Sequence, residues 1–587
     1  MIKNGRVTGK KRVSRLKSAA LCLAAAFFIS GCSAVQKPLV STVKRADVNI
    51  STLTYTAPSY AQPDELVARA NTLMQNTDGM HLINRIKVYG LTLKLEPLLQ
   101  EIATQNALLF ITYLKDQTNA DAQLACAEMD NRLQGYQVDL NAMYAYITGT
   151  PLTLQQQAAE DNRAQIQQLS DAEAQLQVAY NQLYYNLNSI PVNIDGTPMT
   201  YDEILDLPSL AAYQHAFGIW FADMNGRLTG LYRQLLQVRN ALAQANGYTT
   251  YRAYADEQLY FRDVDTAVCA PLRAQVQTSF APAVAQMYDL YYKGVQNPVS
   301  LEMKEGLQAV EHMIATTPQQ LQDCYTYLKQ HGSLLLCSLP NCSRTAYTFT
   351  FHQFNQPFVY VGWVPGSMGE TAVLHELGHA FADFATDYAA LEAYNSYEVM
   401  ELQSMSLEYM SGFNSTALYG SYNQYAELWN SAQCVTNLAY MAAVGTFEDA
   451  VYQSPDMTDE EMLQLYVQIF EGYGLFGTQT NADNRMLWLE NSIFVQSPFY
   501  ADSYLLAGLG AAEMSLNYLD NPTQAMQHYM QLLHYQGDFT GALQQCGLSD
   551  IPESTYVEAL YSRMQQKNLL SFQILESCVQ NTLPPAA

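Results

Sequence analysis

Apolar residues recur every three or four positions over most of this chain, which is the spacing of one face of an α-helix. The pattern extends over residues 64–147, where 108–114 is one of its long apolar faces, and returns over residues 207–315. Between them, residues 155–187 are polar and rich in glutamine, and they are also predicted to be helical. The sequence therefore predicts a mainly α-helical protein.

Three short stretches depart from this pattern and favour β-strands. Residues 190–199 place an Asp-Gly pair between β-prone residues, which predicts a small hairpin with a tight turn. Residues 346–354 and 357–363 are the clearest strands, because they are rich in aromatic and β-branched residues. A small β element is thus predicted directly before the stretch that carries the candidate chemistry.

The chain has 587 residues, too many for one compact core, and its 49% hydrophobic content is ample for a globular protein. We divide it into an N-terminal helical region over 61–205, a second region over 206–565 and a C-terminal tail over 566–587. Residues 32–60 are rich in Ser, Thr, Val and Pro without periodicity, and they are predicted to be a tether.

The first 31 residues resemble an export signal. Seven Lys and Arg residues precede an apolar stretch over 18–29 that is too short to span a bilayer alone. The stretch ends in Ile-Ser-Gly-Cys, which is similar to a bacterial lipobox, so Cys32 is predicted to carry a lipid that anchors the protein in the cell envelope. A plain secretory signal or an uncleaved anchor is the alternative.

The formal net charge is −25, from 30 Lys and Arg against 55 Asp and Glu. Removal of the leader would take away seven positive charges and no negative ones, which gives a net charge of −32. Such a surface repels nucleic acid and anionic lipid headgroups, so no nucleic-acid partner is expected. We interpret the acidity as a solvated exterior and infer no basic partner from it.

Ten cysteines are present, and eight remain when Cys22 of the leader and Cys32 are set aside. Outside the cytoplasm an even number permits disulfides, and the closely spaced Cys337 and Cys342 form the most plausible local pair. Several of the eight are equally compatible with buried free thiols. Their spacings do not match a cysteine-based zinc site. The eight are Cys126, Cys269, Cys324, Cys337, Cys342, Cys434, Cys546 and Cys578.

Residues 371–381 contain His375-Glu376-Leu-Gly-His379, an HExxH motif within an apolar helical stretch. The two histidines are one helical turn apart and project from the same face, so both imidazoles can bind one Zn²⁺. Glu376 is one step round the helix, where it can take a proton from a metal-bound water. Two core histidines on one helix are the alternative interpretation.

Zinc needs a third protein ligand and an open position for water. The metzincin pattern would supply a histidine six residues after His379, but that position is Ala385. Residues 397–410 predict a second helix, in which Glu401 and Glu408 share one face among apolar neighbours. We predict Glu401 as the third ligand and Glu408 as the partner that orients a histidine. Both could instead be surface residues.

The predicted strand at 357–363 would lie beside this site. Many peptidases hold an extended peptide on a strand edge by backbone hydrogen bonds, which predicts Phe358, Val359 and Tyr360 as substrate-binding residues. Ordinary scaffold strands are the alternative. His352 is the nearby imidazole, and we interpret it as structural.

The stretch HELGHAF followed by ELQSMSLE resembles the oligoendopeptidase F branch of the thimet oligopeptidase family of zinc peptidases. Further similar segments occur at 246–254, 261–263, 280–282, 528–533, 537 and 547–550, so the resemblance covers roughly residues 180–560. It implies that Glu401 is the third zinc ligand. It also implies two helical lobes around a deep channel that admits short, unfolded peptides and excludes folded proteins.

Peptide hydrolysis also needs a donor for the tetrahedral oxyanion. The resemblance implies donors on a helix near the C-terminus that contains His and Tyr, and Tyr500 and Tyr504 are the candidates in this chain. The family's His would fall between Val495 and Pro498, where this chain has none, and later Tyr positions fall on Leu or Ala.

The sequence thus predicts an endopeptidase with one Zn²⁺ per chain that hydrolyses short peptides at a bacterial cell envelope. Because of the missing His, a catalytically impaired peptide-binding lipoprotein that keeps the metal site is an alternative. A structural envelope lipoprotein with an accidental motif is another.

Overall fold

The computed structural model describes residues 45–76, 81–364, 369–385, 395–414, 416–419, 423–478, 491–551 and 555–582. The predicted leader and Cys32 lie outside these residues. None of the described helices is long and apolar enough to span a membrane.

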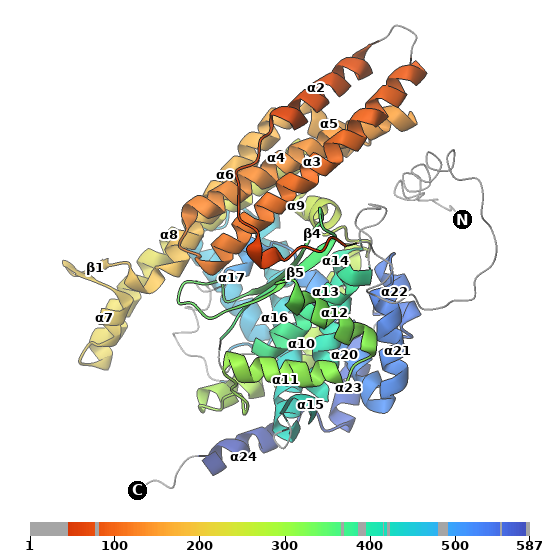
Figure 1. The fold of residues 1–587 in the computed structure, drawn as a ribbon. Coiled ribbons are helices and arrows are strands. Elements are labelled where there is room, and N and C mark those ends of the chain that lie inside the picture. The colour runs from red at the N-terminus through yellow and green to blue at the C-terminus, as the bar shows by residue number, and fades with distance from the viewer. Residues whose placement is uncertain are drawn as a thin grey trace, which may run out of the picture.

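Long N-terminal helices form an arm that projects from the rest of the molecule (Figure 1). Two apolar clusters hold the helices of the arm together, one around Leu66, Val88 and Leu140 and the other around Ile102 and Met129. The predicted glutamine-rich helix is divided into two at Asn162. The helices of the arm are α2 (Ala61–Gln75), α3 (His81–Lys115), α4 (Ala120–Thr148), α5 (Leu154–Asp161) and α6 (Arg163–Tyr185).

The predicted hairpin is confirmed. Strands β1 (Val192–Ile194) and β2 (Thr197–Met199) pair antiparallel. The turn between them places Asp195 and Gly196 at φ values of 51° and 92°, which this type of tight turn requires. Helix α7 (Tyr201–Leu205) follows, and α8 (Leu210–Ala245) then runs from the hairpin back to the body.

The body is helical and surrounds one continuous apolar core. Helix α14 (Tyr397–Phe413) lies in its middle and packs closely along α20 (Ala501–Asp520). The two helices approach closely at Gly508, where an added Cβ would meet Met405 Cε at 2.8 Å. The other helices of the body are α9 (Tyr251–Tyr254), α10 (Cys269–Tyr292), α11 (Met303–Ala315), α12 (Gln319–Gln330), α13 (Gly369–Ala385), α15 (Thr416–Tyr419), α16 (Asn423–Gln453), α17 (Asp459–Gly472), α19 (Ile493–Gln496), α21 (Pro522–Leu533), α22 (Phe539–Gln545), α23 (Tyr556–Gln566) and α24 (Phe572–Thr582).

A three-stranded sheet lies beside α13, between the arm and the body (Figure 1). The two predicted strands are confirmed as β4 (Ala346–Phe351) and β5 (Gln356–Gly362), which pair antiparallel. A third strand, β3 (Leu334–Cys337), pairs parallel to β5 and was not predicted. A run of four residues is too short for its periodicity to distinguish a strand from part of a helix.

The predicted tether is described from residue 45 onward, and this part lies against the body. Ile50 is 2% exposed and packs with Phe358 and Tyr360 of the sheet. Its backbone N–H donates to the carbonyl of His331 at 2.8 Å. Residues 45–53 of the predicted tether therefore include contacts with the body.

The predicted disulfide between Cys337 and Cys342 is not formed. The two residues lie in one apolar cluster, but the Cys342 thiol donates instead to the Cys337 carbonyl, at an Sγ–O distance of 3.4 Å. The seven cysteines whose side chains the structure describes are all buried free thiols, which is the alternative that the sequence left open.

Candidate active site

Helices α13 and α14 bring the three predicted metal ligands together. His375 and His379 lie one turn apart on α13, and Glu401 faces them from the first turns of α14. Glu401 Oε2 lies 3.3 Å from His375 Nε2 and 3.6 Å from His379 Nε2. One potential ligand atom from each residue lies within 4.8 Å of the others. The proximity predicted from the sequence is therefore confirmed.

Gly378 allows the two helices to come this close. A Cβ at this position would lie 2.6 Å from Ser404 Cα and 3.0 Å from the Gln403 carbonyl oxygen. Both are backbone atoms, which cannot move aside as the end of a flexible side chain can. The glycine inside the HExxH motif thus sets the distance from the histidines to Glu401.

Two hydrogen bonds orient the ligands. Glu408 Oε2 lies 2.9 Å from His375 Nδ1, which leaves Nε2 free to face Glu401 and the cavity. The Ser404 hydroxyl donates to Glu401 Oε2 at 3.2 Å. Burial would raise the pKa of Glu401, but His379 and His375 hold it well below its usual range, so the carboxylate is anionic.

Glu376 is one step round α13 from His375, and its side chain faces β4 of the sheet at the edge of the same cavity. The Thr348 hydroxyl, on β4, donates to Glu376 Oε2 at 2.6 Å and also reaches the Glu376 backbone carbonyl at 3.0 Å. Burial raises the pKa of Glu376 above its ordinary value, which makes the carboxylate a better proton acceptor. Thr348 was not predicted, and nothing local in the sequence distinguishes it from other strand threonines.

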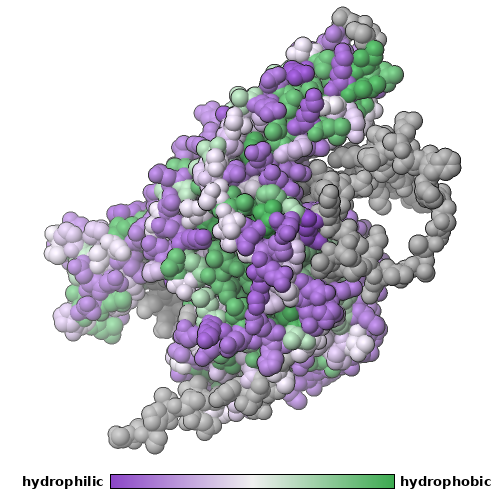
Figure 2. Space-filling model, viewed as in Figure 1, coloured by the Kyte–Doolittle hydropathy of each residue, from purple (hydrophilic) through white to green (hydrophobic). Residues whose placement is uncertain are grey.

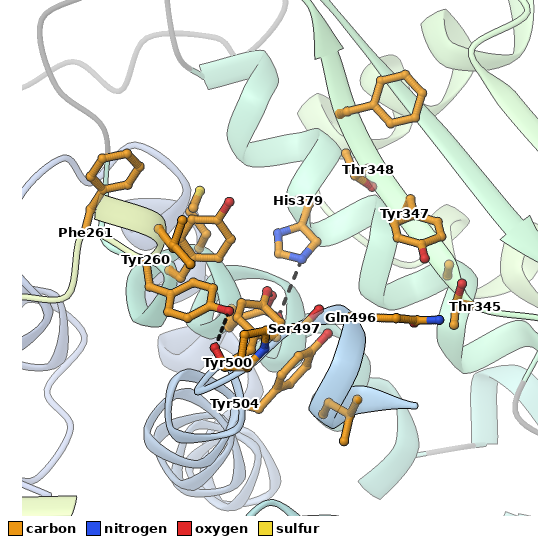
Figure 3. Close-up of a pocket in the computed structure, with 18 of the residues that line it drawn as sticks. Tyr260, Phe261, Thr345, Tyr347, Thr348, His379, Gln496, Ser497, Tyr500 and Tyr504 are labelled. Carbon is orange, nitrogen blue, oxygen red and sulfur yellow. Dashed lines mark hydrogen bonds and ion pairs between the residues drawn. The ribbon is translucent and has the colours of Figure 1, made fainter. Parts of the chain in front are cut away.

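The residues His375, His379, Glu401, Glu376 and Thr348 line a cavity of about 1370 Å³. Its walls come from α13, α14, β4 and α20 of the body and from α4 and α6 of the arm, including Asn131 and Gln177. In Figure 3, Tyr500, Tyr504 and Gln496 share the cavity with His379 and with Thr348 of β4. The site therefore lies deep between the two lobes.

The predicted substrate-binding residues Phe358, Val359 and Tyr360 do not line this cavity. They lie on β5, which is the middle strand of the sheet, and every residue of β5 is buried. Their backbone groups already pair with β3 and β4. The prediction was wrong because strand order cannot be derived from the sequence of one strand. The strand that lines the cavity is β4, through residues 346–350.

Tyr500 and Tyr504 both reach the site, from the start of α20. The Tyr500 hydroxyl donates to Glu401 Oε1. The Tyr504 ring stacks on His375, with 6.2 Å between ring centroids, and meets the Tyr500 ring edge-on at 4.8 Å. Where the resemblance implies a histidine, Gln496 and Ser497 line the cavity. His352 lines it as well, and burial lowers its pKa.

The segment before α20 is held by buried polar side chains that the sequence did not single out. Phe499 has a φ of 65°, a left-handed conformation that is unfavourable for a bulky residue. Its N–H donates to Glu448 at 3.0 Å, and its carbonyl accepts from Arg262 at 3.1 Å. The neighbouring Pro498 carbonyl accepts from the Tyr260 hydroxyl at 2.7 Å. Together these bonds fix the backbone from which Tyr500 projects.

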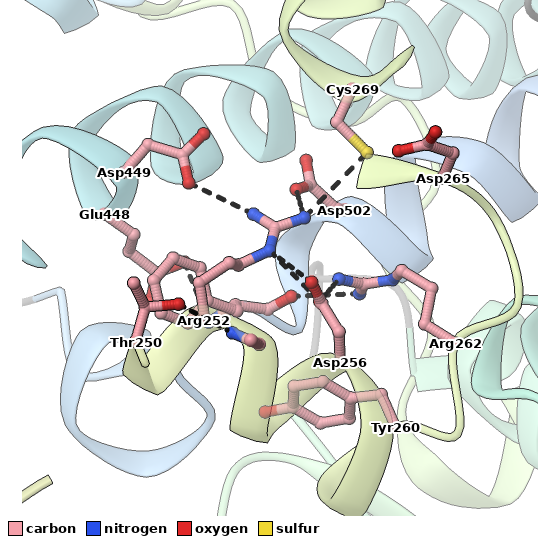
Figure 4. Close-up of polar contacts among 12 residues, drawn as sticks. Thr250, Arg252, Asp256, Tyr260, Arg262, Asp265, Cys269, Glu448, Asp449 and Asp502 are labelled. Carbon is pink, nitrogen blue, oxygen red and sulfur yellow. Dashed lines mark hydrogen bonds and ion pairs between the residues drawn. The ribbon is translucent and has the colours of Figure 1, made fainter. Parts of the chain in front are cut away.

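Figure 4 shows the network behind this segment. Arg252 and Arg262 both bind Asp256, and Arg252 also binds Asp502 at 2.8 Å. Arg262 donates to Glu398 of α14 at 2.7 Å and to Ser503 of α20 at 2.7 Å. The network therefore fixes α14 and α20 relative to each other. In the sequence, the indication of this buried network is an arginine between aromatic and acidic residues, at 260–263.

A further buried cation, Arg239 on α8, joins the arm to the same region. Its Nε donates to Glu173 of α6 at 2.6 Å, and its terminal nitrogens donate to the carbonyls of Phe494 and Val495. Arg239 is fully buried. The two lobes are thus connected directly behind the cavity.

The fold is the mainly helical, two-lobed fold of oligoendopeptidase F-like peptidases, with the predicted small sheet beside the HExxH helix. Among solved structures, the chain resembles PZ peptidase A with an inhibitor, at a TM-score of 0.70 and 17% identity over 89% of this chain and 100% of that chain. It resembles a protein described as an oligoendopeptidase F at a TM-score of 0.69 and 18% identity, over 89% of this chain and 98% of that chain. A Bacillus anthracis protein described as an oligoendopeptidase F gives a TM-score of 0.67 and 16% identity, over 88% of this chain and 97% of that chain. No protein-family model and no curated protein matches the chain.

We predict that Gly378→Ala separates α13 from α14, because its Cβ would collide with backbone. The expected result is a loss of about 1–3 kcal/mol in the free energy of unfolding, as for other overpacked cores, and at least tenfold weaker zinc binding. Metal titration and thermal unfolding measure the two effects. The matched control is Gly412→Ala in α14, where the nearest contact of the added Cβ is Asn430 Cβ at 3.4 Å. Equal zinc affinity in both variants would contradict the prediction.

We predict that Arg262→Lys leaves the zinc ligands in place but loosens the backbone at Phe499. Lysine keeps the charge beside Glu398 but cannot also reach Ser503 and the Phe499 carbonyl in the same planar geometry. Turnover of a peptide should fall about tenfold or more with unchanged zinc content. Arg227→Lys, at an exposed ion pair with Asp223, is the control. An unchanged kcat would show that the network is not needed for positioning.

Proposed function

We propose that this protein is a zinc-dependent endopeptidase that hydrolyses short peptides. The observation that carries the proposal is the convergence of His375, His379 and Glu401 within 4.8 Å at a deep cavity, with Glu376 beside them. Two imidazoles and one carboxylate are the ligand set of a catalytic zinc site with an open position. The fold that the chain shares with solved peptidases agrees with this proposal.

The donor set fits zinc better than a harder metal, because two of its three ligands are neutral nitrogens. When bound, the metal supplies a water of lowered pKa and polarises the carbonyl that is to be attacked. The chain's own residues prepare the site. Glu408 fixes the tautomer of His375. The Ser404 hydroxyl donates to one carboxylate oxygen of Glu401, and the Tyr500 hydroxyl donates to the other.

Glu376 is proposed as the general base. Its raised pKa favours uptake of a proton from the attacking water, and Thr348 holds the carboxylate in one orientation. After the attack, the same carboxyl group can give the proton to the leaving amine. The Thr348 hydroxyl is therefore a positioning group for the base.

Tyr504 is proposed as the donor to the oxyanion. The Tyr500 hydroxyl proton is directed to Glu401, so that residue orients a ligand instead. Tyr504 stands over His375 and lines the cavity. The two tyrosines, which the sequence analysis could not tell apart, thus have different proposed roles.

The proposed substrates are short, unfolded peptides. The cavity lies between the arm and the body, so a folded protein cannot bring a peptide bond to the histidines. The outer strand β4 lines it with residues 346–350 and can pair with an extended chain. The preference for short peptides would then come from the shape of the cavity between the arm and the body, and not from a pocket for one side chain.

We also propose that the protein acts at a bacterial cell envelope, held by a lipid on Cys32. The basic leader and the lipobox-like sequence support this proposal. Metabolic labelling with a radioactive fatty acid, lost in Cys32→Ser, tests it.

A second candidate function is peptide binding without turnover. The observation that favours it is the presence of Gln496 and Ser497 where the resemblance implies a histidine. An amide or hydroxyl is a weaker donor than a charged imidazole. Hydrolysis of a peptide pool by the wild type distinguishes the two functions.

We predict that Glu376→Gln binds zinc as the wild type does but loses peptidase activity by a factor of at least about a hundred, because the base is removed while the ligands remain. Zinc content and cleavage of a quenched-fluorescent peptide library measure this. Zinc in both proteins with cleavage in neither would support the peptide-binding function. Absence of zinc from the wild type would refute the metal site.

We predict different effects for the two tyrosines. Tyr504→Phe should lower kcat about a hundredfold with little change in KM or zinc affinity, since an oxyanion donor is lost. Tyr500→Phe should instead weaken zinc binding about tenfold, since Glu401 loses a hydrogen bond. Steady-state kinetics and zinc titration of the two variants provide the comparison. The opposite pattern would exchange the two proposed roles.

A further inference from the structure

Phe261 is an apolar side chain that is exposed inside the cavity beside the proposed zinc site. In the described part of the chain, fourteen large apolar side chains are exposed, and Phe261, at 39%, is the one that lines this cavity. Five of the others belong to α3, at the tip of the arm where Figure 2 shows hydrophobic colour, and none of these five lines the cavity. Phe261 therefore differs from them, because a peptide in the cavity can cover it.

The backbone at Phe261 is in an unfavourable conformation. Its φ of 49° is left-handed, a region that glycine and asparagine adopt much more readily than a bulky residue does. Phe499 is left-handed as well, but its ring is 1% exposed and packs against Tyr251 and Tyr452, so burial helps to offset the strain. The Phe261 ring has much less burial to offset it. Strained positions that core packing does not explain are typical of functional sites.

The residues on either side of Phe261 are fixed in the interior. The Tyr260 hydroxyl donates to the Pro498 carbonyl at 2.7 Å, and the Arg262 N–H donates to the Asp256 carbonyl at 2.6 Å. Tyr260 and Arg262 are each 7% exposed. A π-helical turn, η3 (Ala255–Leu259), leads into this segment, and such irregular turns are frequent at functional sites. The buried neighbours thus hold the side chain between them at the cavity wall.

An aromatic wall connects Phe261 with the proposed metal ligands. Ring contacts lead from His375 to Tyr504 and on to Tyr500, with 6.2 Å and 4.8 Å between centroids. The Tyr500 ring then meets the Tyr260 ring at 5.2 Å, and Phe261 is the next residue in the chain. All five side chains line the cavity. A peptide bound at the metal site would therefore meet an apolar surface on this side.

α14 supplies the rest of this surface. The Tyr397 N–H donates to the Tyr260 carbonyl at 3.1 Å, which joins the start of α14 to the segment of Phe261. Tyr397 and Met400 are partly exposed and line the cavity, as does Leu259. Figure 3 shows Phe261 and Tyr260 on the side of His379 that lies away from Tyr347 of the sheet. The apolar surface is therefore separate from the edge of β4.

The distance along α14 places this surface relative to the cleaved bond. Tyr397 precedes the proposed ligand Glu401 by one helical turn, which is about 6 Å. An extended peptide advances about 3.4 Å per residue. A substrate side chain beside Tyr397 would therefore belong to a residue about two positions from the bond that is cleaved.

We propose that Phe261, Leu259, Tyr397 and Met400 form a subsite that binds one aromatic or large aliphatic side chain of the peptide substrate. The proposal rests on the proposed function of the cavity as a peptide site, and it adds the class of side chain that the cavity selects. Two rings, a thioether and an aliphatic side chain gain contacts with such a side chain, whereas a small polar one gains little. Binding also removes the exposed Phe261 ring from water.

The test uses short peptides that differ in one residue, which is either Phe or Ser, placed at successive positions. Binding is measured with the full chain carrying Glu376→Gln, so that the peptide is not consumed, and cleavage is measured with the full chain carrying Glu376. At one fixed distance from the cleaved bond, Phe should give at least about tenfold tighter binding than Ser and at least about tenfold higher kcat/KM. Mass spectrometry of the products gives that distance.

Two variants and a control assign this preference to the ring of Phe261. Phe261→Asn removes the ring and accepts the left-handed backbone, so it should lower the Phe-to-Ser ratio at least about fivefold, mainly through KM, without a lower Tm or a change in zinc content. Phe261→Tyr keeps the ring and should keep the ratio. The matched control is Tyr292→Asn at the end of α10, where a ring of 42% exposure lies outside the cavity, and it should also keep the ratio.

The subsite is overturned if the parent binds and cleaves the Phe and Ser peptides equally, if it binds neither, or if Phe261→Asn keeps the ratio. A lower Tm with loss of zinc in Phe261→Asn would also overturn it, because the ring would then have a structural role. The endopeptidase function is tested separately by the same measurements. A parent protein that prefers the Phe peptide in binding but cleaves neither peptide would keep the subsite and refute turnover.

Discussion

The carboxylate of Glu401 is buried at 2% exposure inside a helical core, and this constraint organises the site. A buried carboxylate is stable only if hydrogen-bond donors or positive charges surround it. Here the surroundings are two imidazoles of α13, the Ser404 hydroxyl of α14 and the Tyr500 hydroxyl at the start of α20. Three helices must therefore meet at one point. The glycine at 378 permits the approach of α13 to α14.

Two of these helices, α14 and α20, are fixed a second time by charges behind the site. Arg262 binds Glu398 of α14 and Ser503 of α20, and Asp502 is held by Arg252 and Arg273. Burial would raise the pKa of Asp502, but these arginines lower it to about 2, so the pairs stay ionised. The network compensates for the left-handed backbone at Phe499. Strain of this kind persists only where neighbouring interactions fix the structure.

The sequence by itself determined the features that depend on local geometry. Helical spacing places His375 and His379 on one face, an Asp-Gly pair specifies the hairpin turn, and a carboxylate among apolar residues marks Glu401 as buried. The tertiary structure decided the features that join distant segments. One such feature is the pairing of β5 with a strand on each of its edges. Two others are the hydrogen bonds from Thr348 to Glu376 and from Arg262 to Glu398, which is 136 residues away in the sequence. A periodic pattern records which face of an element is buried, but not against which element, because many partners offer the same apolar surface.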